Sequence, residues 1–271
     1  MPEQLASWGE GWLWLGGSLL LAILWANLVW YFRKPRAGRI GELVARLNAW
    51  RFSPLLLQFL RLLYYIGLPT AALYLGHDAV VQRYLGLSDE PSNVWLRWVY
   101  DIGWAAALGI GTWVLLAVGW QTYRRALHAA GKQNPLTDTS ASGWIFLREA
   151  AYHEVHWAFY RSAPIFILAQ AQIAGNEYWG VWIGLALVAL EAALNPAWRE
   201  GLADPERAPA RLVRGALAVV SSVMFIQTTD GNLLLSLLLH FCVSWGLAIL
   251  MRVLPPLPTH KHDRTQIANP S

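Results

Sequence analysis

The sequence predicts an all-α fold, a single-domain polytopic membrane protein with about seven transmembrane helices. Of its 271 residues, 56% are hydrophobic and only 14% are charged, whereas soluble domains are about 25% charged. The hydrophobic residues form runs of about 20 residues, the length of helix that crosses the core of a bilayer. Tryptophan, which suits the headgroup layer, recurs near the ends of these runs. A lipid bilayer is therefore the expected partner.

Each apolar run is long enough for one crossing. The runs occupy residues 11–32, 54–76, 100–120, 146–173, 178–198, 212–226 and 232–254. Polar and basic segments separate them, as in a chain that crosses repeatedly. The first run is preceded by Glu3 and Glu10 but by no basic residue, so it is expected to be an uncleaved anchor rather than a secretory signal.

The basic residues predict the orientation. With the N-terminus outside, the cytoplasmic loops hold 17 of the 21 Lys and Arg residues, and the outer loops hold only Arg83 and Arg97. Because cytoplasmic loops are enriched in basic residues, we expect the N-terminus outside and the C-terminus in the cytoplasm, across a plasma or inner membrane. The net charge of +4 then faces anionic lipid, and no nucleic-acid partner is expected.

Shorter segments complete the organisation. Residues 39–50 alternate basic and aliphatic side chains, which predicts an amphipathic cytoplasmic helix on the membrane surface. Residues 255–271 begin with closely spaced prolines and predict a disordered cytoplasmic tail. The single cysteine, Cys242, excludes an internal disulfide. The chain therefore divides into an N-terminal part (11–145), a C-terminal part (146–254) and the tail, without a soluble domain.

The fourth run is unusually polar, because residues 152–161 alone contain a carboxylate, two imidazoles and a guanidinium. At about 100° per residue, one face of this helix holds Glu149, His153, His156 and Tyr160, and another holds Glu154 and Arg161. Ionisable groups are costly in hydrocarbon and commonly mark functional sites. Two polar faces predict a helix that is surrounded by other helices.

Other runs offer polar partners for this helix. The fifth run contributes Glu191 and Asn195, the seventh contributes His240, and the second contributes Arg61 as a counter-charge. With a rise of about 1.5 Å per residue, Glu154 and Glu191 come to similar depths. We therefore expect one water-accessible cavity in the cytoplasmic half of the bilayer, formed by Glu154, His156, Arg161, Glu191, Asn195 and His240.

Two segments carry a family resemblance. Phe159-Tyr160-Arg161 matches the end of a Glu-Glu-x-x-x-Arg motif, and residues 231–244, with His240, match a His-x-x-x-Asn motif. Glu191-Ala192-Ala193-Leu194-Asn195 is the best counterpart of the Phe-x-x-x-His motif between them. Residues 146–254 thus resemble the CAAX-processing and bacteriocin-processing (CPBP, or Abi) intramembrane endopeptidases, and the resemblance implies a CPBP-like helical core in the C-terminal half.

The motifs depart from the family pattern at several positions. His156 and Trp157 stand where the paired glutamates are expected, Asn195 replaces a histidine, and Ser244 replaces an asparagine. The resemblance is therefore compatible with an active endopeptidase and with a descendant that has lost proteolysis.

The resemblance also implies roles. In an active enzyme, Glu154 would be the general base that activates a water with help from His156. His240 and Asn195 would stabilise the oxyanion, and Arg161 would be a charged neighbour of Glu154. The implied substrate is a membrane protein or peptide, and this hypothesis requires no cofactor and no metal.

Two alternatives remain open. His153 and His156, with Glu149 on the same helical face and His240 from the seventh run, could hold a transition metal or a haem. Alternatively, Gly103, Ala107 and Gly111 form a small-residue face suited to close helix packing, as in a non-enzymatic membrane subunit or scaffold.

Overall fold

A computed structural model describes residues 2–34, 38–75, 94–131, 142–228 and 231–254, and the regular structure of these residues is helical. The elements are α1 (Pro2–Arg33), α2 (Arg39–Ala49), α3 (Ser53–Leu62), the π-helix η1 (Leu63–Gly67), α4 (Leu68–Tyr74), α6 (Val94–Ala129), α7 (Gly143–Gln170), α8 (Asn176–Leu194), α9 (Pro196–Ala203), α10 (Ala208–Gln227) and α11 (Leu233–Val253). The predicted all-α class is confirmed. The predicted tail, residues 255–271, lies outside the described residues.

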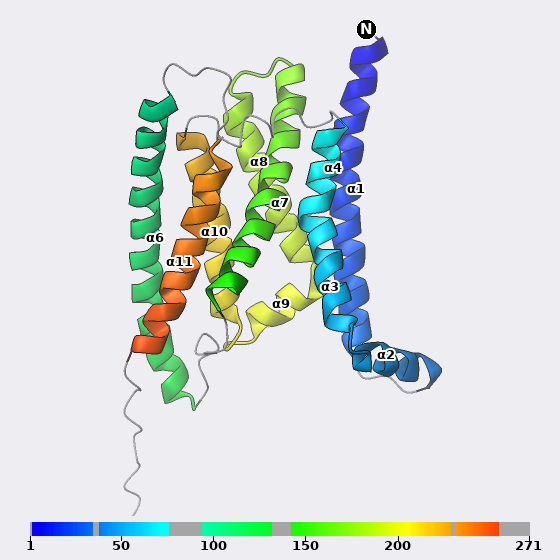
Figure 1. Cartoon of the computed structure of the whole chain (residues 1–271), viewed down its shortest axis with the longest axis vertical. Coiled ribbons are helices and arrows are strands. Elements are labelled where there is room, and N and C mark those ends of the chain that lie inside the picture. The colour runs from blue at the N-terminus through cyan, green and yellow to red at the C-terminus, as the bar shows by residue number, and fades with distance from the viewer. Residues whose placement is uncertain (1, 35–37, 76–93, 132–141, 229–230, 255–271) are drawn as a thin grey trace, which may run out of the picture.

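The long helices form a bundle in which α7 is central (Figure 1). Helix α7 contacts α8, α11, α1 and η1, while α6 lies on the far side of α11. The short helices α2 and α9 lie at one end of the bundle. Helix α2 confirms the helix predicted at 39–50, and none of its residues is buried. Its position on a membrane surface stays a prediction.

Six helical segments are long and apolar enough to cross a membrane, among the residues described: Trp12–Phe32, Ser53–Ala72, Trp95–Ala129, Asn176–Leu194, Ala208–Gln227 and Leu233–Val253. They correspond to six of the predicted runs and indicate a multi-pass membrane protein. Helix α7, with 28 residues, is also long enough, but its polar side chains keep it outside this group. Fifteen of its residues are buried, as predicted for a helix surrounded by others.

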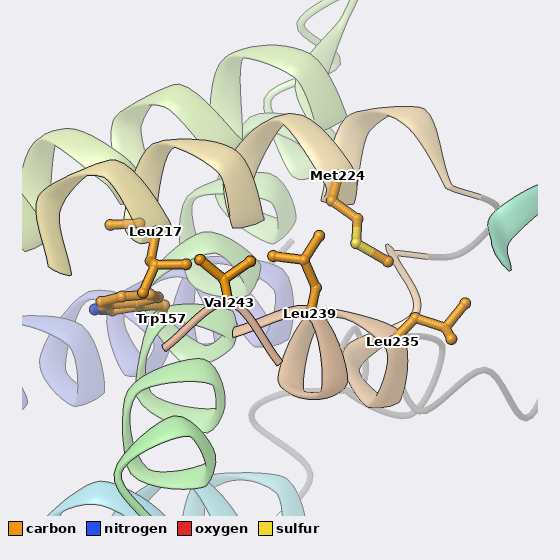
Figure 2. Packing of buried hydrophobic residues seen from close by; sticks show 7 residues of the cluster. Trp157, Leu217, Met224, Leu235, Leu239 and Val243 are labelled. Atoms are coloured by element: carbon orange, nitrogen blue, oxygen red, sulfur yellow. The ribbon is translucent and has the colours of Figure 1, made fainter. Parts of the chain in front are cut away.

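An apolar core joins α7, α10 and α11 (Figure 2). Trp157 of α7 lies beside Leu217 of α10 and Val243 of α11, and the same cluster continues to Met224 of α10 and Leu239 of α11. Helix association in lipid depends on such close packing, because lipid tails are as apolar as the side chains themselves. This core fixes the faces that α10 and α11 present to the polar residues of α7.

Helices α7 and α8 approach each other closely at two glycines of α8 that are spaced four residues apart. A Cβ atom added to Gly184 would lie 2.7 Å from Cα of Arg161, and one added to Gly180 would lie 2.7 Å from Cα of Ile165. Glu191 follows Gly184 by two helical turns, so it lies on the same face of α8. The glycine contact therefore directs Glu191 towards α7.

The small-residue face predicted at Gly103, Ala107 and Gly111 does not pack closely against another described helix of this chain. Its use against another subunit stays a prediction. A Cβ atom added to Gly103 or to Gly111 meets nothing within 4 Å among the described residues. A single helix does not reveal which of its faces a neighbour will cover, since small residues also occur on lipid-facing surfaces. The close contact is made by Gly180 and Gly184 instead.

Replacing Gly184 with valine is expected to destabilise the bundle by about 1–3 kcal/mol, because the new side chain overlaps backbone atoms of α7. The matched control is Gly103→Val, which adds the same side chain where the space is open. Unfolding of both variants in mixed detergent, followed by tryptophan fluorescence, compares their stabilities. Equal stabilities would contradict the assigned contact.

Candidate functional site

The polar side chains of α7 fall into two clusters on different faces. The first, called here the closed cluster, contains Glu154, Arg161, Ser221 and His240. The second, called the cavity cluster, contains Tyr64, His156, Tyr160 and Glu191. Glu154 and Arg161 share one face and His156 and Tyr160 share another, as predicted, whereas His153, predicted on the face of His156, stacks on His240 of the closed cluster and Glu149 binds Arg61.

A continuous hydrogen-bond network holds the closed cluster together. Nδ1 of His240 lies 2.8 Å from Oε1 of Glu154, and Ser221 donates its hydroxyl hydrogen to Oε2 of the same carboxylate. Nη2 of Arg161 donates to Oγ of Ser221 over 2.9 Å, and its Nη1 lies 3.9 Å from Oε2. Both carboxylate oxygens are thus bound by groups from α10 and α11.

The closed cluster is sealed from solvent. The side chain of Glu154 has 0% exposure, and Arg161, Ser221 and His240 are also buried. The imidazole of His240 stacks on the rings of His153 and Trp157, with centroid distances of 5.6 and 5.4 Å. Because a buried charge needs partners, this network ties α7, α10 and α11 to one another.

The cavity cluster is built on the opposite side of α7. Nε2 of His156 lies 2.9 Å from Oε2 of Glu191 and 3.3 Å from the hydroxyl oxygen of Tyr64. That hydroxyl oxygen is in turn 3.4 Å from the hydroxyl oxygen of Tyr160. Tyr64 comes from η1, and π-helical turns within helices often coincide with functional sites. The cluster joins three segments that are distant in sequence.

This cluster borders a cavity of about 440 Å³ between α1, α3, η1, α8 and α10. Its polar lining consists of Arg61, Tyr64, Tyr65, Glu191, Asn195 and Arg214. Most of the remaining wall is apolar and comes from α1 and the α3–α4 segment. The volume lies within the range of ligand pockets, about 300–1,000 Å³, which are mostly apolar with a few convergent polar groups.

Within the cavity cluster, Glu191 is the carboxylate that reaches the open space. Its side chain is 20% exposed, whereas that of His156 is 3% exposed. The imidazole therefore lies behind the carboxylate and binds one of its oxygens. A carboxylate held by a buried imidazole and facing a cavity is suited to general acid–base chemistry.

The expectation of one shared cavity is wrong. Glu191 and Asn195 line the cavity and His156 contacts Glu191, but Glu154, Arg161 and His240 belong to the closed cluster. The predictions used depth along the helices, and depth does not specify the direction in which a side chain points. Helix α7 separates groups that lie at similar depths.

Asn195 and Arg61 also have partners other than those predicted. Oδ1 of Asn195 accepts hydrogen bonds from the backbone amides of Ala197 and Trp198 and so caps α9. It therefore does not join His240 in an oxyanion site. The guanidinium of Arg61 binds both oxygens of Glu149, at 3.1 and 2.6 Å, rather than Glu154.

The predicted metal or haem ligands do not form one group. His153 stacks on His240, whereas His156 contacts Glu191 on the other side of the helix. Among the described residues, no three His, Cys, Asp or Glu side chains are arranged to hold a metal ion.

Three important residues were not predicted. Ser221 bridges Glu154 and Arg161, Tyr64 contacts His156, and Arg214 lines the cavity. The pairs Ser221-Ser222 and Tyr64-Tyr65, which interrupt apolar runs, were the available signals. Arg214 was assigned to a cytoplasmic loop because it adjoins the basic segment before the sixth run.

The chain matches no protein-family model. Neither a curated protein nor a solved structure was found to resemble it.

Proposed function

We propose that the protein is a CPBP-like intramembrane hydrolase in which Glu191, rather than Glu154, is the general base. The observation that carries this proposal is the exposure of the Glu191 carboxylate to the 440 Å³ cavity, with His156 bound behind it at 2.9 Å. The closed cluster then has a structural role. It occupies both oxygens of Glu154 and leaves that side chain without solvent contact.

The reaction is hydrolysis of a peptide bond in a membrane protein or peptide. Glu191 removes a proton from a water molecule, and the water oxygen forms a bond with the carbonyl carbon. The carbon–nitrogen bond of the tetrahedral intermediate then breaks, and Glu191 returns the proton to the leaving amine. His156 is a positioning residue, because it holds Oε2 of Glu191 and does not line the cavity.

The proposed topology has seven crossings, with α7 as the fourth. The six apolar segments and α7 alternate in direction through the bundle, and α2 and α9 lie at the same end (Figure 1). The basic residues of this end favour the cytoplasmic side. Arg61, Asn195 and Arg214 approach that end, so the cavity belongs to the cytoplasmic half of the bilayer.

A second candidate function is that of a non-enzymatic membrane subunit descended from such an enzyme. It is favoured by the burial of Glu154, the carboxylate closest in sequence to the family motif, inside a complete hydrogen-bond network. In that case the cavity would not support turnover.

Hydrolysis of a library of membrane peptides by the purified protein distinguishes the two candidates. We expect cleavage by the wild type and loss of cleavage in Glu191→Gln. The control Glu200→Gln, at an exposed position on α9, should remain active. Absence of cleavage by the wild type, or full activity of Glu191→Gln, would overturn the hydrolase proposal.

A further inference from the structure

The lining of the cavity includes two guanidinium groups and one carboxylate. Arg61 and Arg214 both line it and interact electrostatically with each other. The charge of Arg61 is matched by Glu149, through two hydrogen bonds. Glu191, the carboxylate in the lining, is bound to His156.

Arg214 makes no hydrogen bond or ion pair with a carboxylate among the described residues, and Glu149, which acts on it electrostatically, is already bound by Arg61 and Arg148. The aromatic ring of Trp198 lies 5.6 Å from the guanidinium carbon of Arg214, and the nearby guanidinium of Arg211 has the same sign. A guanidinium in a partly buried, apolar setting gains from an anion, and its planar fork of N–H groups matches the oxygens of a carboxylate or a phosphate. The cavity therefore favours a negatively charged ligand.

The cavity combines guanidinium groups with an extensive apolar wall. Along the α3–α4 segment, Arg61 and Leu68 line the same cavity seven residues apart, which corresponds to roughly 10 Å. Along α1, the lining is an apolar wall made of Leu21, Ala22, Trp25, Ala26, Val29 and Trp30. A ligand that fills this space needs both a charged head and a hydrocarbon part.

We propose that the cavity binds a single-chain amphiphile with an anionic head group, with the head against Arg214 and Arg61 and the chain between α1 and α4. The volume of about 440 Å³ lies near the lower end of the range for ligand pockets and suits one chain. The inference goes beyond the proposed function, because the amphiphile is a ligand of the cavity and not the peptide that is hydrolysed.

Binding of simple probes to the full-length protein in a nonionic maltoside tests this inference without turnover. The probes are dodecylphosphonate, dodecanoate, dodecanol and inorganic phosphate, and native mass spectrometry and shifts of the unfolding temperature report binding. We expect at least one anionic dodecyl probe to bind, and the preferred head group then separates a phosphate from a carboxylate ligand. Equal binding of dodecanol, or equal binding of inorganic phosphate, would overturn the amphiphile assignment.

Variants locate the head group. Arg214→Gln is expected to weaken binding of the anionic probe by about tenfold or more. The control Arg207→Gln makes the same change at an exposed position outside the cavity and should bind normally. If Arg214→Gln does not fold, Arg214→Lys keeps the charge without the fork and should bind more weakly than the wild type. Wild-type affinity for the anionic probe in Arg214→Gln would overturn the inference. If Arg214→Lys has to be used instead, wild-type affinity in that variant would overturn it.

The outcomes for the two proposals remain distinct, because none of the probes contains a peptide bond. Binding without peptide hydrolysis would leave the anionic-amphiphile site in place and remove the hydrolase. Peptide hydrolysis without binding of any anionic probe would do the reverse.

Discussion

Replacing Glu154 with alanine is expected to lower the free energy of unfolding by about 3–5 kcal/mol, because the change leaves the buried charge of Arg161 without its carboxylate. The same change removes the hydrogen-bond partners of Ser221 and His240. Unfolding in mixed detergent, followed by tryptophan fluorescence, measures the difference. The control Glu177→Ala removes an exposed carboxylate from the first turn of α8 and should have little effect.

A double variant separates loss of the ion pair from loss of packing. Glu154→Met combined with Arg161→Met removes both charges while keeping long side chains, and such replacements of buried ion pairs are often neutral or stabilising. We therefore expect the double variant to be more stable than Glu154→Ala. Wild-type stability in Glu154→Ala would contradict the structural role of the closed cluster.

Replacing Glu191 with glutamine is expected to lower turnover by about 10²–10⁴-fold, the usual contribution of a general base. The amide has nearly the shape of the carboxylate but cannot accept the proton. His156→Gln should lower turnover as well, because Oε2 of Glu191 loses the imidazole that positions it. Steady-state hydrolysis of the best peptide from the library measures both effects.

The pH profile and the double variant test whether His156 acts through Glu191. His156→Gln should change the pH dependence of kcat, whereas the exposed variant Glu200→Gln should not. Residues that act as a unit are strongly non-additive, so His156→Gln combined with Glu191→Gln should be no slower than Glu191→Gln alone. If the loss of turnover in the double variant equals the product of the losses in the two single variants, a shared role of His156 and Glu191 is contradicted.

The sequence predicted the helices well because each apolar run has the length of one crossing. It was less accurate at their ends. Helix α6 extends over 36 residues, Val94–Ala129, although only residues 100–120 form the apolar run. Helical hydrogen bonding continues through the polar residues on both sides of the apolar run. The side chains of these residues do not reveal where the helix ends.

The two polar faces of α7 were also predictable, since they follow from 3.6 residues per turn. The partners on those faces were not. Ser221 and His240 meet Glu154 because the apolar core fixes how α10 and α11 are rotated about their axes. Gly180 and Gly184 similarly direct Glu191 towards His156. The rotation of each helix about its own axis depends on packing against its neighbours, so the sequence of one apolar run alone does not predict it.

The role of Asn195 could have been predicted from its neighbour. An asparagine followed by proline is a common way to begin a helix, with the side chain as the cap and the proline in the first turn. The structure has this arrangement at the start of α9. The resemblance to the CPBP endopeptidases instead implied a catalytic role, which the cap geometry does not support.

The most direct test of the account is the accessibility of the two carboxylates. A hydrophobic carbodiimide, applied to the folded protein and followed by peptide mass spectrometry, should modify Glu191, which borders the cavity, and should spare Glu154, which has 0% exposure. The unfolded chain provides the reference in which both residues react. Modification of Glu154 in the folded protein, with Glu191 protected, would contradict the assignment of a closed cluster and an open cavity.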